Sequence, residues 1–261
     1  WDFGDGTTSN QQNPTHIYAS SGLYEVKLIA TNNFGTDSLI KVDYVNVAKT
    51  AAPIGGFDTR CGQGSLELTA TPASTGDLNW FDDATSANLV GSGDTFTTPS
   101  LNATTSYWVE EWITPPAQNV GPADNTFGTG GIFNGDRVLF FDALTEFTLK
   151  SVKVYADGSG QRTVLIRDGA GDLYMDTVVN LVDGEQRIYL NWTIDPGNSY
   201  SFGANPSPAL YRNRTGANFP YTVPGVVSIT GSDATSSDEF YYYYYDWEVQ
   251  EPSCRSDRTE V

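Results

Sequence analysis

The sequence has little of the material from which most catalytic centres are built. Its 261 residues include one histidine, His16, and two cysteines. The motifs His-Glu-x-x-His, Cys-x-x-Cys and Gly-x-Ser-x-Gly are absent, as is a glycine-rich phosphate loop. The 32 acidic residues could supply a paired acid–base site, but no pair stands out from the acidic turns. We therefore predict that the chain is not an enzyme.

Basic residues are scarce too. Lysine and arginine together number 14 against 32 acidic residues, which gives a formal net charge of −18. This charge argues against nucleic acid as a partner and against anionic membrane surfaces. No apolar run approaches the length of a membrane span, so we expect no membrane insertion. Calcium is the more natural counterion for such a chain.

A sustained apolar stripe at helical spacing is also absent. Instead, 26 glycines and 13 prolines punctuate short runs in which apolar and polar residues alternate. In one run Tyr24, Val26 and Leu28 alternate with Glu25 and Lys27, as in a strand with one buried face. Aromatic residues make up 13% of the chain, which is ample for the cores of several domains. An all-β protein is therefore predicted.

Residues 1–47 carry a recognisable set of motifs. They open with Trp1-Asp-Phe-Gly-Asp-Gly6, continue with Asn13-Pro-Thr-His-Ile-Tyr18, and contain the alternating run just described. This stretch resembles the polycystic kidney disease (PKD) repeat, an immunoglobulin-like β-sandwich that is common as a spacer in bacterial surface and secreted proteins. The family's first two strands, which normally precede these motifs, are missing. The resemblance therefore implies an N-terminally truncated domain over residues 1–49, in which His16 is a structural residue.

A second sandwich is expected in residues 50–117, beginning within a short linker at 48–56. Its features are Cys-Gly-x-Gly from Cys61, a central Trp80, and Thr-Thr-x-Tyr ending at Tyr107. They resemble the bacterial immunoglobulin-like module of large secreted Bacteroidetes proteins. In that family the final strand follows a Cys-x-Ser-x-Arg segment, which this chain supplies only at residues 254–258. The resemblance implies a discontinuous domain, 50–117 plus 252–261, with residues 118–251 inserted between its last two strands.

The two cysteines, Cys61 and Cys254, are each other's only possible partners within the chain. An even pair in an acidic β protein favours an oxidising, extracellular setting. A disulfide between them would close the split domain around its insert, and this is the pairing that we predict. The alternative is two small buried thiols.

The insert contains about eight strand-like runs separated by Gly and Asp turns. These runs are 137–141, 146–155, 162–167, 173–181, 187–194, 200–202, 226–230 and 240–249. Eight strands suggest a jelly roll. In the second run the apolar parity changes between Leu149 and Val152, which predicts a β-bulge near Lys150 and Ser151. The segment resembles the jelly-roll modules of secreted Bacteroidetes proteins and, more loosely, carbohydrate-binding modules. The whole chain is thus expected to hold two immunoglobulin-like sandwiches and one jelly-roll sandwich.

The five tyrosines at residues 241–245 give the first candidate ligand site. Strict alternation would place Trp247 on the core side with the odd-numbered tyrosines, and Tyr242 and Tyr244 on the opposite face. Aromatic rings on an exposed sheet face can stack on sugar rings, but they can equally pack beneath a neighbouring loop or domain. A polar, aromatic segment, interpreted as a loop, could reach the same ligand or form local salt bridges. It consists of Tyr211, Arg212, Asn213 and Arg214, of which the first three are the candidate ligand-binding residues.

Asp246 is the expected ligand of a structural Ca²⁺ ion. The first and last strands of a jelly roll commonly lie near each other, so Asp124 and Asn125 at the start of the insert can approach Asp246. Oxygen ligands of this kind suit Ca²⁺. The run Tyr-Asp-Trp-Glu-Val also resembles the closing strand of carbohydrate-binding modules in which an Asp near this place holds a structural ion. Alternatively, Asp246 caps a turn or pairs with Arg137.

These features together predict a non-catalytic, extracellular region of a large bacterial cell-surface or secreted protein, with an adhesion or scaffold role. The resemblances imply cargo of the type IX secretion pathway, such as gliding adhesins. Expected partners are a surface polysaccharide or another cell-surface glycan, and neighbouring β domains of the same long chain. The alternative is an accessory carbohydrate-binding region of a secreted polysaccharide-degrading enzyme.

Overall fold

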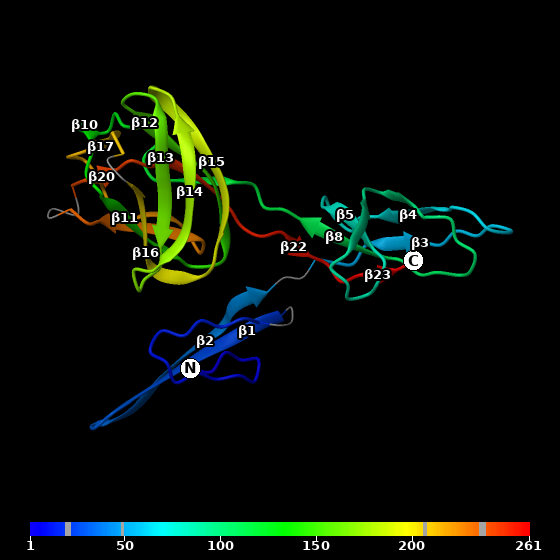
Figure 1. Ribbon diagram of the computed structural model, residues 1–261. Helices are drawn as coiled ribbons and strands as arrows, with labels where there is room; N and C mark the ends of the chain where they lie inside the picture. Colours follow the sequence, from blue (N-terminus) through cyan, green and yellow to red (C-terminus); the bar gives the residue numbers. More distant parts are fainter. Residues whose placement is uncertain (19–21, 48–49, 206–207, 235–238) are drawn as a thin grey trace. The chain divides into compact units, whose positions relative to one another are not determined.

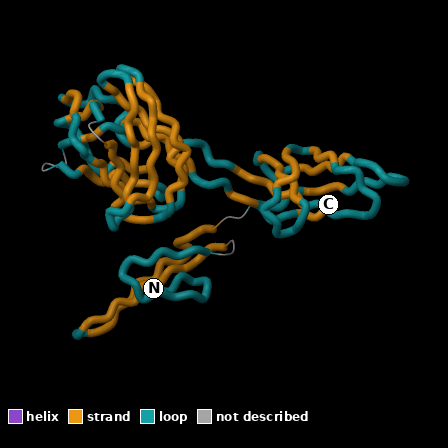
Figure 2. The backbone as a smooth tube through the Cα atoms, in the orientation of Figure 1, coloured by secondary structure: helices purple, strands orange, loops and turns teal. Residues whose placement is uncertain are grey.

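The computed structural model describes residues 1–18, 22–47, 50–205, 208–234 and 239–261 (Figure 1). These residues form strands, turns and loops without any helix (Figure 2), which confirms the all-β prediction. The described residues accordingly offer no helix that could cross a membrane. The chain divides into two compact units, Trp1–Ile113 with Cys254–Val261, and Thr114–Ser253. Residues 48 and 49, part of the expected linker, lie outside the described residues.

The N-terminal part of the first unit is organised around one hairpin. Strands β1 (Gly22–Asn32) and β2 (Gly35–Val47) pair antiparallel. Asn32 holds the turn, because its side-chain oxygen accepts hydrogen bonds from the backbone N–H groups of Phe34 (2.8 Å) and Gly35 (3.2 Å). On the other edge of β1, Asp2 and Lys27 exchange two backbone hydrogen bonds of 2.8 Å. The motif at residues 1–6 is thereby attached to the hairpin.

Two small sheets follow. In the first, β4 (Glu67–Thr71) lies between β3 (Ile54–Gly56) and β7 (Thr95–Thr97). In the second, β5 (Asp77–Phe81) lies between β6 (Leu89–Ser92) and β8 (Trp108–Ile113). The two sheets share one core, formed by Leu68, Ala70, Leu78, Trp80, Phe96, Tyr107 and Val109. They therefore make a β-sandwich.

Residues 254–261 return to the second of these sheets. Strands β22 (Cys254–Arg255) and β23 (Thr259–Glu260) both pair antiparallel with β8. Between them, Nε of Arg258 donates to Glu110 at 2.9 Å, and its guanidinium lies 3.5 Å from the ring centre of Phe81. A shielded ion pair and a cation–π contact thus hold the returning segment to the sheet. We call the sandwich formed by residues 53–113 and 254–261 the split sandwich.

The predicted disulfide between Cys61 and Cys254 is wrong, because both cysteines are free and exposed. Cys254 pairs with Ile113 at one end of β8. Cys61 belongs to the loop at the other end, where residues 57–60 and 62–64 line a pocket together with Tyr107 and Val261. The five steps from Trp108 to Ile113 span about 17 Å of strand, whereas a disulfide needs Cα atoms within about 7 Å. Both cysteines lie in the first compact unit, but this does not bring them within bonding distance.

The second unit, Thr114–Ser253, is built from two larger sheets. The seven-stranded sheet contains β9 (Gln118–Val120), β10 (Gly130–Phe133), β12 (Phe147–Ala156), β15 (Gly184–Ile194), β17 (Leu210–Asn213), β20 (Tyr241–Tyr242) and β21 (Tyr245–Gln250). The six-stranded sheet contains β11 (Val138–Ala143), β13 (Gly160–Arg167), β14 (Leu173–Leu181), β16 (Gly197–Asn205), β18 (Tyr221–Val223) and β19 (Val227–Ser232). Trp247 of the first sheet packs edge-on against Phe141 (5.4 Å) and Phe202 (5.1 Å) of the second. One aromatic core therefore joins the two sheets.

The bulge predicted near Lys150 is confirmed. The register of β12 against both β15 and β21 shifts between Leu149 and Ser151. As a result Leu149 before the shift and Val152 after it are both fully buried, although they differ in parity. The bulge turns Ser151 and Lys153 to the outer face of the seven-stranded sheet, away from the core.

The tyrosine run does not form one continuous strand, which is a second correction. Strand β20 ends at Tyr242 and β21 begins at Tyr245, and Tyr243 between them has a φ of +65°. Asp246 has a φ of +48° as well. Because left-handed residues interrupt the two-residue period, the run does not divide into an inner and an outer face. All five tyrosines are at most 1% exposed.

Candidate functional site

Tyr242 and Tyr244 are core residues, so the predicted sugar-stacking platform is wrong at these positions. The ring of Tyr244 stacks on Phe202 at 3.9 Å between centres, and its hydroxyl donates to the carbonyl of Gly203 at 2.7 Å. Burial raises the pKa of Tyr244 well above its ordinary value. The hydroxyl of Tyr242 accepts a hydrogen bond from Arg212 at 3.0 Å. Neither ring has a face left for a ligand.

Tyr211, Arg212 and Asn213 lie on strand β17 and not on the predicted loop. Asn213 is fully buried and bonds to three groups: the carbonyls of Asn125 (3.0 Å) and Gly128 (3.3 Å), and the hydroxyl of Tyr245 (2.7 Å). It is therefore not accessible to a ligand, and it fastens residues 125–128 over the sheet.

The guanidinium of Arg212 is enclosed by aromatic rings. It lies 3.7 Å from the ring centre of Phe133 and 5.2 Å from that of Phe240. Tyr211 remains half-buried next to Tyr155, with ring centres 6.3 Å apart. These contacts account for Arg212 as a structural cation between rings.

Two of the three predicted calcium ligands, Asp246 and Asp124, have other partners. Asp246 forms an ion pair with Arg187 and accepts a hydrogen bond from the side-chain amide of Asn119 at 2.8 Å. Asp124 accepts the backbone N–H of Thr126 (2.8 Å) and its hydroxyl (2.6 Å). The proposed alternative partner of Asp246, Arg137, lies instead 3.5 Å from Asp233. N–H and O–H donors thus already point at the carboxylate oxygens of both aspartates. No metal-binding group of three or more His, Cys, Asp or Glu occurs in the described part of the chain, and calcium stays a prediction.

A network of polar and charged side chains crosses the outer face of the seven-stranded sheet. We call it the polar network; it consists of Lys150, Ser151, Arg187, Asp246 and Glu248. The buried Ser151 hydroxyl donates to Glu248 at 2.6 Å and accepts from Arg187 at 2.8 Å. Arg187 also donates to the carbonyl of Asp246 at 3.0 Å, and Lys150 lies 4.0 Å from Glu248. Three neighbouring strands, β12, β15 and β21, are thus tied together by groups of both charges.

Partial burial and a shared hydroxyl restrict the side chains of the polar network. The side chains of Arg187 and Asp246 are only 25% and 20% exposed, so their attraction is screened less than that of a fully solvated pair. The buried Ser151 hydroxyl lies between Arg187 and Glu248 and fixes both at once. The donors and acceptors that face outward are consequently held in set positions.

Tyr189 lies next to the polar network. On β15 it is directly opposite Ser151, and its side chain is 72% exposed. The adjacent pair, Ile188 and Val152, is buried in the core, so Tyr189 and Ser151 share the outer face. An exposed ring beside ordered donors and acceptors suits a ligand that has both an apolar face and hydroxyl groups.

Sequence reasoning missed Tyr189, Arg187 and Glu248. The alternation of Ile188 with Tyr189 in the run 187–194 was the signal available for an outward ring. The contacts of Arg187 and Glu248 could not be read from neighbouring residues, because they arise from the pairing of β12 with both β15 and β21. This pairing brings together residues as far apart in sequence as Lys150 and Glu248, which are 98 positions apart.

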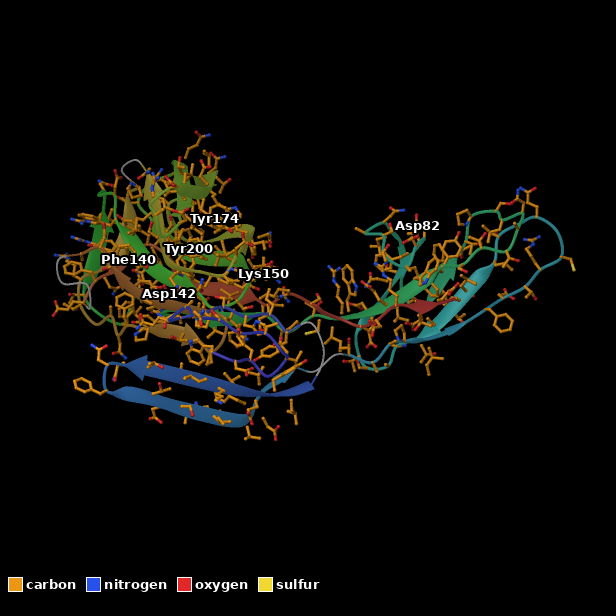
Figure 3. The ribbon with its side chains drawn as sticks, turned by 90° about the horizontal axis from the view of Figure 1, so that it is seen from below. Asp82, Phe140, Asp142, Lys150, Tyr174 and Tyr200 are labelled. Carbon is orange, nitrogen blue, oxygen red and sulfur yellow. The ribbon has the colours of Figure 1, made fainter. Side chains whose placement is uncertain are left out.

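Tyr174 and Tyr200, labelled in Figure 3, form a separate cluster with Asp195. The Tyr174 hydroxyl donates to the Asp195 carboxylate at 3.0 Å, and the Tyr200 hydroxyl donates to the Asp195 carbonyl at 3.2 Å. Burial raises the pKa of both tyrosines. Both tyrosines stay protonated near neutral pH, and their hydroxyls hold Asp195 in place.

The single histidine is used structurally in the N-terminal segment. His16 stacks on Phe3 with ring centres 4.0 Å apart, and its Nε2 lies 2.7 Å from the carboxylate of Asp5. Thr7 donates both its hydroxyl (2.6 Å) and its N–H (3.0 Å) to Asp5. The pKa of Asp5 is lowered to about 2, chiefly by the hydrogen bond from the Thr7 hydroxyl. Burial raises the pKa by less than this bond lowers it, and the hydrogen bond with His16 lowers it further.

We expect the Asp5 carboxyl to titrate near pH 2 in the intact chain, and NMR spectra recorded across this pH range measure it. Because this pKa is depressed from 3.8, the interaction stabilises the fold above about pH 3.8 and is lost as the pH falls through about 2. A Thr7→Val variant should raise the pKa of Asp5 towards 3.8, since it removes the hydroxyl hydrogen bond that lowers this pKa most. An unchanged titration in this variant would contradict the assignment.

Two family models match the chain. Residues 1–47 match the PKD domain, and residues 50–115 match the Ig-like domain described as CHU_C associated. The PKD and immunoglobulin-like resemblances inferred from the motifs are thus confirmed. Domains of these two types are typically non-catalytic. No solved structure matches the chain.

Three bacterial collagenases share short similar stretches with it. "Microbial collagenase" of Vibrio alginolyticus is 57% identical over 59 residues, which is 23% of this chain and 7% of the relative. "Collagenase ColA" of Bacillus cereus is 50% identical over 38 residues, 15% of this chain and 4% of the relative. "Collagenase ColA" of Clostridium perfringens is 57% identical over 35 residues, which is 13% of this chain and 3% of the relative. The chain spans at most 7% of these relatives.

Proposed function

We propose that the chain is an extracellular adhesion and scaffold region of a large bacterial surface or secreted protein. In this proposal the PKD segment and the split sandwich are spacers, and the second unit binds a cell-surface glycan. The two matched domain types support a non-catalytic, extracellular role. The collagenase matches are short, at most 23% of this chain and 7% of the relatives, and give no reason to propose collagen cleavage.

The observation that carries the glycan proposal is the position of Tyr189. Its exposed ring lies opposite Ser151, whose hydroxyl joins Arg187 to Glu248. A pyranose has an apolar face of C–H groups that packs on an aromatic ring, and hydroxyls that both donate and accept hydrogen bonds. The polar network presents both kinds of partner in fixed positions. With a net charge of −18, the chain favours a neutral polysaccharide over a polyanionic one.

Affinity electrophoresis of the intact chain in gels containing neutral polysaccharides tests this proposal. At least one polysaccharide should retard the chain, and Tyr189→Ala should weaken that binding about tenfold, the equivalent of ~1.4 kcal/mol of lost stacking. Tyr44→Ala is the matched control, because Tyr44 is 59% exposed but lies on β2, in the other unit. Binding that survives Tyr189→Ala, or that falls equally in Tyr44→Ala, would place the site elsewhere.

A further inference from the structure

One row of side chains crosses the outer face of the seven-stranded sheet at the level of Tyr189. At this level the strands lie in the order β15, β12, β21 and β9. Directly opposite pairs link Tyr189 to Ser151, Ser151 to Glu248, and Glu248 to Asn119. We call these four side chains the cross-strand row. Directly opposite residues are neighbours on the surface of a sheet, so the row runs across the strands.

The pair next to the row shows that its members on β21 and β9 also point outward. Trp247 and Val120 are paired with each other and buried in the core, at 0% and 4% exposure. Because successive side chains of a strand point to opposite faces, Glu248 and Asn119 lie on the outer face. Asn119 is exposed, as Tyr189 is, so both ends of the row are open to solvent.

The row has the length of a short stretch of polysaccharide. Neighbouring strands lie about 4.8 Å apart, so the three steps from Tyr189 to Asn119 span about 14 Å. One residue of an extended glycan is about as long as one strand spacing, so the row holds about three consecutive sugar residues. Among the described strands, β15 pairs only with β12 and β9 only with β21. No further strand of the sheet therefore continues the row at either end.

The row offers a different contact at each position. At one end Tyr189 presents an exposed ring. In the middle the carboxylate of Glu248 is 28% exposed, and a carboxylate that already accepts from Ser151 can accept another hydrogen bond from a sugar hydroxyl. At the other end the amide of Asn119 donates to Asp246 at 2.8 Å, and an amide has further capacity to donate and accept. Stacking at one end and hydrogen bonds beyond it suit consecutive residues of one glycan.

We propose that the cross-strand row binds about three consecutive residues within a linear, neutral polysaccharide, which lies across the strands and continues past both edges of the sheet. The first sugar residue stacks on Tyr189, the second bonds to Glu248 and the third to Asn119. This proposal rests on the proposed glycan binding at Tyr189, and it adds the length, the direction and the internal position of the bound stretch.

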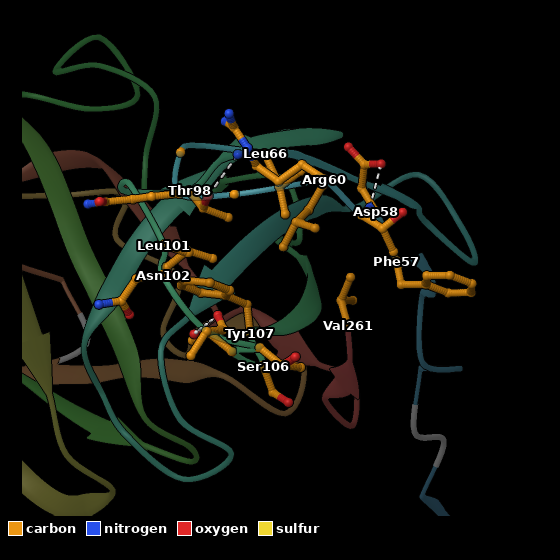
Figure 4. A pocket seen from close by; sticks show the side chains of 18 residues that line it. Phe57, Asp58, Arg60, Leu66, Thr98, Leu101, Asn102, Ser106, Tyr107 and Val261 are labelled. Atoms are coloured by element: carbon orange, nitrogen blue, oxygen red, sulfur yellow. Dashed lines mark hydrogen bonds between the residues drawn. The ribbon is translucent and has the colours of Figure 1, made fainter.

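The opposite mode of binding, capture of a chain end, requires a concave site. A pocket of about 540 Å³ in the split sandwich has that form, and the ring of Phe57 at its rim is 86% exposed (Figure 4). Phe57→Ala therefore tests the pocket as a competing glycan site, while Tyr189→Ala tests the row.

Isothermal titration calorimetry of the intact chain measures the length of the bound stretch. The probes are cello-, xylo-, manno-, laminari- and malto-oligosaccharides of one to five residues. In the series that binds, the dissociation constant should fall about tenfold from one residue to three and less than about twofold from three to five, because only three residues contact the row. Tyr189→Ala should weaken binding at every length, and Phe57→Ala should leave it unchanged.

Asn119→Ala tests the far end of the row. It should weaken binding of the trisaccharide about fivefold and leave binding of the disaccharide unchanged, because only the third sugar residue reaches Asn119. An effect that passed through Asp246 to the polar network would weaken both equally. Asn180→Ala is the matched control, since Asn180 is exposed on β14 of the other sheet and should change neither.

A short-chain and a long-chain fraction of the same polysaccharide test the internal position. At saturation, equal masses of the two fractions should bind equal amounts of the intact chain, because internal stretches are equally abundant in both. Sites at chain ends would bind less protein on the long-chain fraction.

Three results would overturn the cross-strand row and leave glycan binding at Tyr189 standing. They are a single sugar residue that binds as tightly as three, an equal loss of disaccharide and trisaccharide binding in Asn119→Ala, and less protein bound to the long-chain fraction. Binding that is lost in Phe57→Ala and kept in Tyr189→Ala would place the glycan in the pocket. That outcome, or no binding in any series, would contradict the proposed site at Tyr189 as well.

Discussion

Replacing Glu111 by glutamine is expected to lower the free energy of unfolding of the split sandwich by about 3 kcal/mol. Glu111 lies on β8 and is fully buried. Its carboxylate accepts the backbone N–H groups of Ala73 (2.7 Å), Ser74 (3.1 Å) and Gly76 (2.8 Å), together with the Ser74 hydroxyl. A glutamine amide would turn one oxygen into a donor that faces other donors, and at least one buried N–H would lose its partner.

The pH dependence of the split sandwich follows from the same residue. Burial acts to raise the pKa of Glu111, but the hydrogen bonds from Ser74, Gly76 and Ala73 together outweigh it, so the pKa is lowered. Stability from this group is therefore present above the unfolded value of 4.5 and is lost as the pH falls through the lower folded value.

Urea unfolding of the whole chain, resolved by hydrogen exchange at the amides of β5 and β8, measures the effect. Glu67→Gln is the matched control, since Glu67 is exposed on β4 of the same sandwich and should change stability by less than about 0.5 kcal/mol. The two substitutions are chemically identical. A loss below about 1 kcal/mol in Glu111→Gln would show that the carboxylate is not the anchor of residues 73–76.

The second large effect is expected for Tyr244→Ala, which should destabilise the second unit by about 4 kcal/mol. Tyr244 is fully buried, stacked on Phe202 and bonded to Gly203, so its removal leaves a cavity between the two sheets. Tyr244→Phe keeps the ring and loses only the hydroxyl contact, at a cost of about 1 kcal/mol.

Tyr189→Ala should lower the free energy of unfolding by less than about 0.5 kcal/mol, in contrast to Tyr244→Ala, because the ring of Tyr189 is exposed. Thermal and urea unfolding of the intact chain, read from amides of β16 and β21, compares the three variants. A platform role for Tyr244 would produce the reverse order: little change in stability for Tyr244→Ala and loss of glycan binding.

The strands of this protein could largely be predicted from its sequence, because a two-residue period is a local signal. The change of parity between Leu149 and Val152 was sufficient to place the bulge in β12. The tyrosine run misled for the same reason: alternation was assumed through Tyr243 and Asp246, whose left-handed backbone nothing in the neighbouring residues indicates. All five tyrosines are buried.

The candidate site depends on neighbours that are distant in sequence. Ser151, Arg187 and Glu248 meet because β15 and β21 flank β12, and no motif near any of the three residues shows it. The cysteines illustrate the same limit. Cys61 and Cys254 both belong to the first unit, but only the register of β22 against β8 reveals that they lie at opposite ends of the split sandwich.

The most direct test of the proposed function measures binding and turnover in one incubation. The intact chain is mixed with the neutral polysaccharide that retards it most, and bound protein and newly released reducing ends are both quantified. The account predicts saturable binding that depends on Tyr189, with no reducing ends above those of a protein-free control. Release of reducing ends that a single carboxylate substitution abolishes would contradict it.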